Sequence, residues 1–212
     1  MDSVHALNVI GGFETDIRWH RDTDLTGYDL IVIPGGFSYG DHLRAGAIAR
    51  FAPALRAVSE AAARGTRILG ICNGFQILLE AGLLPGAMLR NSSLQFRHQW
   101  VSLRVDANAT PFTTECAPGQ ILRMPIAHGE GNYFARPETI ARLKGDGRIV
   151  FTYSDLEGRA TPGANPNGSL ANIAAITNER GNVMGMMPHP ERCSEAILGG
   201  QDGALIWRSL AA

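Results

Sequence analysis

The sequence has no long apolar run and no excess of charge of either sign. No stretch approaches the roughly 18 consecutive apolar residues of a membrane-spanning helix, and the first residues do not resemble a secretion signal. The formal net charge is −1, from 19 Lys and Arg against 20 Asp and Glu. Nothing in this balance favours nucleic acid or an anionic membrane as a partner. We therefore expect a cytoplasmic protein.

Cysteine is also scarce. The chain has three cysteines, Cys72, Cys116 and Cys193, and their spacing matches neither a zinc site nor an even disulfide framework. A reduced compartment is the simplest setting for such a chain. A lone cysteine is most often a small buried hydrophobe, and we assign that role to Cys116 and Cys193. We expect no metal site in this chain.

The composition indicates one α/β domain over residues 1–212. Hydrophobic residues make up 45% of the chain and charged residues 18%, which is typical of a protein with a buried core. Short apolar runs predict seven strands. They are Leu30–Ile33, Ile68–Cys72, Trp100–Val105, Ile121–Ile126, Ile149–Tyr153, Ile173–Thr177 and Val183–Met187. The first two are continuously apolar, as in strands that are covered on both faces of a parallel sheet.

Helix signals lie between and after these strands. Ala45–Arg64 is rich in Ala, Leu and Arg, with Gly65 placed as a C-cap and Pro53 placed to begin a second helix. The first two strands and this segment form a right-handed βαβ unit. From about Arg90 to Tyr153 only strand and turn signals occur, which indicates a small antiparallel annex. Gly203–Leu210 predicts a short closing helix. The fold class is α/β, a doubly wound and mostly parallel sheet.

Cys72 lies in the pattern Gly70-x-Cys72-x-Gly74, between a buried strand and a helix. This is the cysteine form of a nucleophile elbow, in which glycines allow a sharp turn that lifts the sulfur above the sheet. A helix N-terminus also favours the thiolate. Gly35 and Gly36 follow the other buried strand and should reach the same sheet edge. The N–H groups of Gly36 and Asn73 could then stabilise an oxyanion.

Two histidines have a carboxylate two residues later, and either could be a general base. His128 precedes Glu130, and His189 precedes Glu191. In an extended chain, residues i and i+2 face the same way, so each pair could be a base with its orienting group. Prolines on both sides restrict His189, whereas glycines around His128 indicate a flexible surface loop. The residues favour His189 and leave His128 open. A metal site is a weaker alternative, because neither pair has a third ligand close in sequence.

Together, Gly35-Gly36, the elbow around Cys72 and Pro188–Glu191 resemble the class I (triad) glutamine amidotransferases. Three longer runs, Pro34–Ala49, Ile126–Tyr133 and Met186–Arg192, resemble one group within them. This group is the small, separate glutaminase subunits of phosphoribosylformylglycinamidine synthase, and the likeness extends over nearly the whole chain. The resemblance implies a flavodoxin-like sheet. It also implies a glutaminase that supplies ammonia for converting formylglycinamide ribonucleotide to formylglycinamidine ribonucleotide in purine biosynthesis.

The resemblance implies roles for individual residues. Cys72 would be the nucleophile, His189 the base and Glu191 its orienting carboxylate. The remaining assignments fall into two groups. Glutamine would be bound by Gln76, Asn91, Ser92 and Ser93, and partners would dock on Phe37, Tyr39, Asp41, His42, Arg44, His128, Glu130 and Tyr133. The partners would be a synthetase subunit, which uses ATP and magnesium, and a small bridging subunit. The chain itself lacks a Walker-type phosphate loop.

The sequence departs from the family pattern in two places. Family members open with a strand and a Pro-Gly loop before the helix that Asp2–Val9 matches, and these are absent. We therefore expect the first strand to be missing, Asp16–Trp19 to form the next strand, and the sheet to be open beside the strand that leads to Gly35. His98 stands where the family has Cys, so it receives no role.

Two other functions remain open from the sequence. The chain could be a related hydrolase with an elbow cysteine, or a catalytically impaired assembly subunit.

Overall fold

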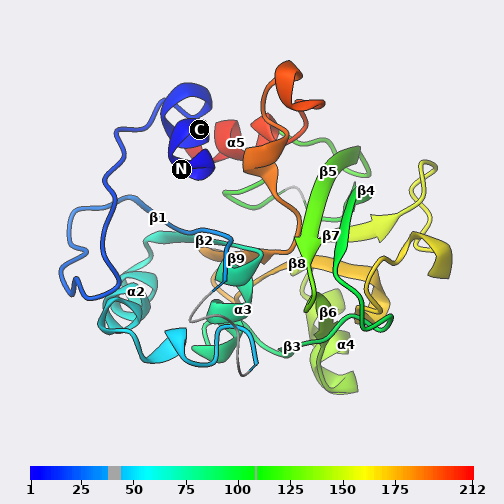
Figure 1. Ribbon diagram of the computed structural model, residues 1–212, viewed down its shortest axis with the longest axis horizontal. Helices are drawn as coiled ribbons and strands as arrows, with labels where there is room; N and C mark the ends of the chain where they lie inside the picture. Colours follow the sequence, from blue (N-terminus) through cyan, green and yellow to red (C-terminus); the bar gives the residue numbers. More distant parts are fainter. Residues whose placement is uncertain (38–43, 108) are drawn as a thin grey trace.

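The computed structural model describes residues 1–37, 44–107 and 109–212, and it contains a seven-stranded sheet (Figure 1). The strand order is β1-β2-β9-β8-β7-β4-β5. Strands β1, β2 and β9 pair in parallel, and the remaining neighbours pair antiparallel. The bounds are β1 Leu30–Ile33, β2 Arg67–Ile71, β4 Arg97–Val105, β5 Ile121–His128, β7 Ile149–Ser154, β8 Ile173–Thr177 and β9 Val183–Met186.

All seven predicted strands are present, and the α/β class is confirmed. The strands expected in the antiparallel annex, among them β4 and β5, pair antiparallel as predicted and extend the main sheet. They are joined to the parallel strands through β8, which pairs antiparallel with β9, and β7, which pairs antiparallel with both β8 and β4. A separate two-stranded antiparallel sheet consists of β3 (Ala87–Leu89) and β6 (Asn132–Phe134).

Helices connect the parallel strands and close the chain. Helix α2 begins with Pro53 at its first turn and ends at Gly65 with φ 101°, as predicted, and α3 packs against β1, β2 and β9. Within the described residues 44–52, where the first of the two predicted helices would begin, the helical structure is limited to a 3₁₀ turn at Ala49–Phe51. At the chain ends, α1 is followed by a π-helical turn, Ala6–Ile10, which packs against α5 (Figure 1). The helix bounds are α1 Asp2–His5, α2 Pro53–Arg64, α3 Asn73–Glu80, α4 Pro137–Gly145 and α5 Ala204–Ala211.

The expectation of no helix between Arg90 and Tyr153 is wrong. Helix α4 has proline in its first turn, Glu138 near its N-terminus and basic residues near its C-terminus, which are ordinary helix signals. Only Leu143 of this helix is fully buried, so no strong apolar stripe marks the segment.

The sheet is open beside β1, as expected. Strand β1 is an edge strand, and its four residues are only partly buried. Next to it lies a groove of ≈ 890 Å³, lined by side chains that include Leu7, Phe13, Val32 and Leu55. The prediction of a strand at Asp16–Trp19 is wrong, because this segment is irregular. Within the described ranges it has no ladder partner, and a strand requires one.

Two general properties of the described part bear on function. None of its helices is both long and apolar enough to span a membrane. Its His, Cys, Asp and Glu residues form no group of three or more that could hold a metal ion.

Candidate active site

Cys72 occupies a strained turn between β2 and α3. Its backbone has φ 50° and ψ −104°, a conformation that costs a residue with a side chain about 1–3 kcal/mol. The flanking glycines make the turn possible, since a Cβ on Gly74 would lie 2.0 Å from the Ile33 carbonyl oxygen. A Cβ on Gly70 would lie 2.5 Å from Leu78 Cδ1. The strand–turn–helix geometry predicted for the elbow is confirmed.

The loop after β1 brings Gly35 between Cys72 and His189. A Cβ placed on Gly35 would lie 2.8 Å from His189 Cε1 and 3.5 Å from Cys72 Cβ. The thiol also lies 3.7 Å from the Ala127 carbonyl oxygen near the end of β5. Residues from the ends of β1, β2, β5 and β9 therefore meet at one place, as the rule for parallel sheets predicts.

His189 and Glu191 form a buried pair. Their Nδ1 and Oε1 atoms are 2.6 Å apart, and the residues are 2% and 6% exposed. No hydrogen-bond partner for His189 Nε2 exists among the described residues. Burial lowers the pKa of His189, but interactions with the Cys72 sulfur and the Glu191 carboxylate outweigh it and raise the pKa to about 9. The geometry therefore favours an imidazolium beside Cys72.

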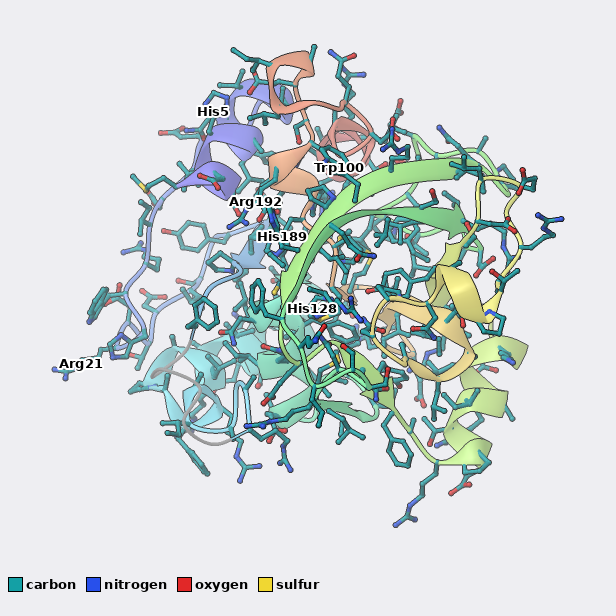
Figure 2. The ribbon with its side chains drawn as sticks, turned by 45° about the vertical axis from the view of Figure 1, so that its right-hand side comes forward. His5, Arg21, Trp100, His128, His189 and Arg192 are labelled. Atoms are coloured by element: carbon teal, nitrogen blue, oxygen red, sulfur yellow. The ribbon has the colours of Figure 1, made fainter. Side chains whose placement is uncertain are left out.

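His128 does not lie in a flexible surface loop, and that expectation is wrong. It is the last residue of β5 and is 3% exposed. Like His189, it lies in the interior of the protein (Figure 2). Glu130 does not orient it, because Glu130 Oε2 accepts a hydrogen bond from the Ala45 N–H at 3.0 Å. Burial, together with the charge of His189, lowers the pKa of His128 to about 4. Of the two candidate histidines, only His189 is paired with its carboxylate.

The two predicted oxyanion donors come from the loop after β1 and from the first residue of α3. Gly36 is exposed, has φ 144° and donates no backbone hydrogen bond to a described residue. Asn73 is the first residue of α3, so its amide lies at the positive end of the helix.

The residues predicted to bind glutamine have different environments. Gln76 is 4% exposed, and its amide nitrogen donates to the Glu130 carbonyl oxygen at 2.6 Å. Ser92 is exposed and Ser93 is half-buried. The Asn91 side chain is fully buried and makes four hydrogen bonds within the protein. Asn91 therefore has no group left for a substrate, which contradicts its predicted contact with glutamine.

The predicted docking residues are only partly at the surface. Tyr39, Asp41 and His42 lie outside the described residues. Phe37 is 73% exposed, Arg44 pairs with Glu80, and Glu130 is partly exposed. His128 and Tyr133 cannot contact a partner directly, because both are buried and Tyr133 donates a hydrogen bond to the Pro85 carbonyl oxygen.

Comparison with known proteins identifies the family. Residues 2–200 match the CobB/CobQ-like glutamine amidotransferase domain. The chain is 60% identical to the phosphoribosylformylglycinamidine synthase subunit PurQ of Moorella thermoacetica, over 99% of this chain and 89% of that protein. The PurQ subunit of Thermomicrobium roseum is 54% identical, with the same coverage. The chain belongs to the PurQ family of glutamine amidotransferases.

A solved PurQ-family structure agrees with this assignment. The structure of PurLQS from Thermotoga maritima contains a chain with 44% identity and a TM-score of 0.87, covering 99% of this chain and 90% of that chain. The similarity extends over the whole chain, so the family likeness stated from short motifs is confirmed by the fold.

Sequence reasoning missed two features of this PurQ-family site. The first is the packing of Gly35 between Cys72 and His189, which no local pattern reveals because the three residues come from three strand ends. The second is a buried polar network around His128 that includes Asn167 and Tyr153. Asn167, which comes from an irregular segment rich in Pro, Gly and Asn, is 0% exposed.

Proposed function

We propose that this chain hydrolyses glutamine through Cys72, as the glutaminase subunit of phosphoribosylformylglycinamidine synthase in purine biosynthesis. The observation that carries the proposal is the position of Cys72 in a strained elbow, across Gly35 from the His189–Glu191 pair. The PurQ-family relatives, which are named as subunits of that synthase, support the choice of reaction. Residues 1–212 act as a single amidotransferase domain in this proposal.

The first half of the reaction releases ammonia. The Cys72 thiolate attacks the side-chain carboxamide carbon of glutamine, and the carbonyl oxygen becomes an oxyanion. The N–H groups of Gly36 and Asn73 stabilise it, and loss of one such donor typically costs about 3–4 kcal/mol of activation free energy. His189 gives its Nε2 proton to the amide nitrogen. The carbon–nitrogen bond then breaks, and ammonia leaves a glutamyl thioester on Cys72.

The second half restores the enzyme. His189 Nε2, now without its proton, removes a proton from a water molecule, which attacks the thioester carbon. The Cys72 thiolate leaves, and glutamate is released. Glu191 holds Nδ1 throughout and stabilises each imidazolium, as the 2.6 Å contact allows. Gln76, Ser92 and Ser93 remain the candidates that bind the α-amino and α-carboxylate groups of glutamine.

Ammonia must reach an acceptor before water protonates it, so the chain should work in a complex. We place a synthetase subunit, which uses ATP and magnesium, and a small bridging subunit as its partners in the cytoplasm. The likeness to a chain of PurLQS supports an assembly of this kind. The docking surface would include Phe37, Arg44 and Glu130, with Tyr39, Asp41 and His42 from the same stretch of sequence.

Replacing Gly35 with alanine should lower turnover on the order of 10²-fold, because the new Cβ would displace His189 from the elbow. Glutamate release by the complex measures the effect. Gly163→Ala is the matched control, since nothing lies within 4 Å of a Cβ at Gly163. Equal turnover of the two variants would contradict the assigned geometry.

The isolated chain should be a poor glutaminase that its partners activate by about tenfold or more. The physical reason is that Gly36 is exposed and adjoins the exposed Phe37. A partner docked on Phe37 can therefore hold the Gly36 N–H in the orientation that stabilises the oxyanion. Glutamate release is compared with and without the synthetase and bridging subunits.

The same assay separates the alternatives. Phe37→Ala should reduce activation, whereas Ile197→Ala, at another exposed apolar residue, should not. The same turnover per subunit with and without partners would reject this gating. No glutamate release in either condition would contradict the glutaminase function and favour an assembly subunit or another kind of hydrolase.

A further inference from the structure

A continuous network of buried polar side chains adjoins the catalytic residues, with His128 at its centre. His128 Nδ1 lies 3.1 Å from Asn91 Oδ1, and Nε2 lies 3.5 Å from Asn167 Nδ2. The Asn167 amide also donates to the Tyr153 hydroxyl at 3.3 Å. Each of these side chains is at most 3% exposed. A buried network of this kind specifies one arrangement when all of its groups are paired.

The hydrogen bonds of Asn91 determine which nitrogen of His128 carries the proton. The Asn91 amide nitrogen donates to the carbonyl oxygens of Gln95 and His128, at 2.8 and 2.9 Å. Its Oδ1 accepts from the Gly131 N–H at 2.9 Å, so it also acts as the acceptor toward His128. His128 Nδ1 therefore donates, and Nε2 is free to accept from Asn167. The neutral imidazole satisfies both neighbours, in agreement with its lowered pKa.

The network holds a turn against the elbow helix. The turn is Gly129–Gly131, and the Asn91 backbone N–H donates to the Gly129 carbonyl oxygen at 2.9 Å. On its other side, the Glu130 carbonyl oxygen accepts from Gln76 Nε2 at 2.6 Å. Gln76 lies one turn into the helix that begins after Cys72. A displacement of the Gly129–Gly131 turn would therefore displace the start of this helix, through the hydrogen bond between Gln76 and Glu130.

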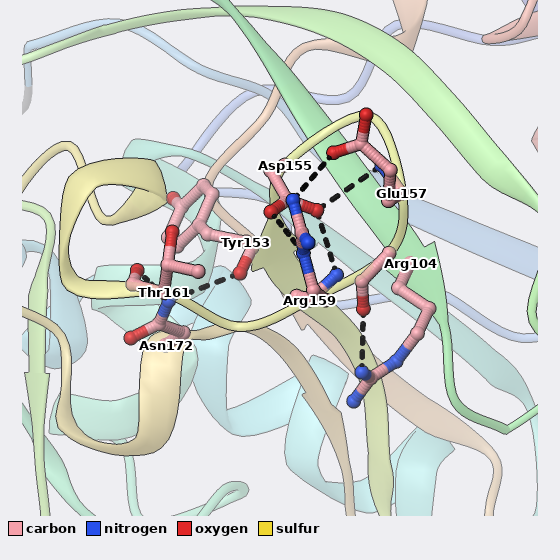
Figure 3. Close-up of polar contacts among 8 residues, drawn as sticks. Arg104, Tyr153, Asp155, Glu157, Arg159, Thr161 and Asn172 are labelled. Carbon is pink, nitrogen blue, oxygen red and sulfur yellow. Dashed lines mark hydrogen bonds and ion pairs between the residues drawn. The ribbon is translucent and has the colours of Figure 1, made fainter.

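The same network also fixes Ser92. The Ser92 N–H donates to the Asn167 carbonyl oxygen at 2.9 Å, and a Cβ on Gly168 would lie 2.7 Å from Ser92 Cβ. Asn172 anchors the loop that carries Asn167, because its amide donates to the carbonyl oxygens of Tyr153 and Thr161 (Figure 3). The position of Ser92 is therefore fixed by the loop that carries Asn167, which Asn172 holds in place through its hydrogen bonds.

We propose that His128, as a neutral imidazole that donates from Nδ1 to Asn91, is a positioning residue for glutamine binding. It fixes the Gly129–Gly131 turn and Ser92 relative to the elbow helix, and these groups form the wall of the glutamine site beside Cys72. Its ring nitrogens are engaged within the network, so it takes no part in proton transfer. This inference rests on the proposed glutaminase function.

Two conservative variants test the Nδ1 contact. In His128→Asn the side-chain amide nitrogen takes the place of Nδ1, so the hydrogen bond donated to Asn91 is kept. In His128→Gln the amide nitrogen takes the place of Nε2, so the donor to Asn91 is lost. We expect His128→Gln to raise the KM for glutamine about tenfold with kcat within about twofold, and His128→Asn to stay within about threefold of wild-type KM. His98→Gln, at an exposed histidine of β4, is the control. The same KM for His128→Asn and His128→Gln, whether raised or unchanged, overturns the proposal.

A labelling experiment separates this proposal from the proposed function. Iodoacetamide alkylates Cys72 without using the glutamine site, whereas the glutamine analogue 6-diazo-5-oxo-L-norleucine must first bind there. His128→Gln should slow labelling by the analogue about tenfold and leave labelling by iodoacetamide within about twofold. Equal slowing of both reagents would overturn the positioning role. A wild-type chain that the analogue does not label, with the synthetase and bridging subunits present, would contradict the glutaminase function itself.

Discussion

Replacing Cys72 with alanine is expected to abolish glutamine-dependent synthesis by the complex, while synthesis from added ammonium salt continues at the wild-type rate. Cys72 lies across Gly35 from the imidazole ring of His189, which pairs with Glu191, and alanine offers no nucleophile. The partner's chemistry needs only ammonia, so external ammonia should bypass the loss. Product formation is measured with each nitrogen source.

Cys116→Ala is the control for this variant. Cys116 is also 5% exposed, but burial, with smaller contributions from nearby acidic residues, raises its pKa to about 11, so it stays an unreactive thiol. This control should retain glutamine-dependent activity. Glutamate release by Cys72→Ala above the background of a heat-inactivated sample would show that Cys72 is not the nucleophile.

Replacing His189 with glutamine should lower kcat by about 10²–10⁴-fold with the partners present, because the leaving amine then lacks its proton donor. Glutamine keeps much of the size and polarity of the side chain but cannot exchange a proton near neutral pH. Steady-state glutamate release gives the effect. The control is His5→Gln, since His5 also pairs with a carboxylate, Glu195 at 2.7 Å, but at the surface. A loss in His5→Gln as large as that in His189→Gln would reject the assignment.

The same variant has a stability readout. The pKa of folded His189 is about 9, above the ordinary value of 6.5, so the protonated form is favoured in the folded state. Its contribution to stability is fully present below about pH 6.5 and is lost as the pH rises through about 9. The melting temperature of the wild type should therefore exceed that of His189→Gln most at pH 6, and the difference should shrink by pH 9.5. A difference that grows with pH would contradict the imidazolium at His189.

Features that depend on neighbours in sequence could be predicted without the structure. The elbow at Cys72 follows from glycines two residues on each side of it, and the His189–Glu191 pair follows from a spacing of two between prolines. Helix α2 was predicted from Pro53 and Gly65 for the same reason. Helix α4 carried comparable end signals at Glu138 and could also have been predicted.

Features that depend on distant segments could not be predicted. The glycines around His128 indicated a mobile loop, but Asn91 and Asn167, 37 and 39 residues away, pair with its ring and bury it. Asn91 was assigned to glutamine from the family resemblance, but its side-chain amide makes four hydrogen bonds within the protein. Tyr133 was assigned to docking, although its hydroxyl reaches the Pro85 carbonyl oxygen inside the protein.

The sequence by itself determined the family of this protein and the chemistry proposed for it. The signals were a cysteine at an elbow, a histidine with a carboxylate two residues later, and a family likeness in long runs of residues. These are local properties, because backbone turns and i, i+2 spacing involve only a few adjacent residues. Tertiary structure alone decided which polar residues can reach a substrate or partner and which are buried, with their hydrogen-bonding groups paired inside the protein. Burial and hydrogen-bond pairing depend on segments that meet only after the sheet has formed, and so Asn91, His128 and Tyr133 proved to be internal.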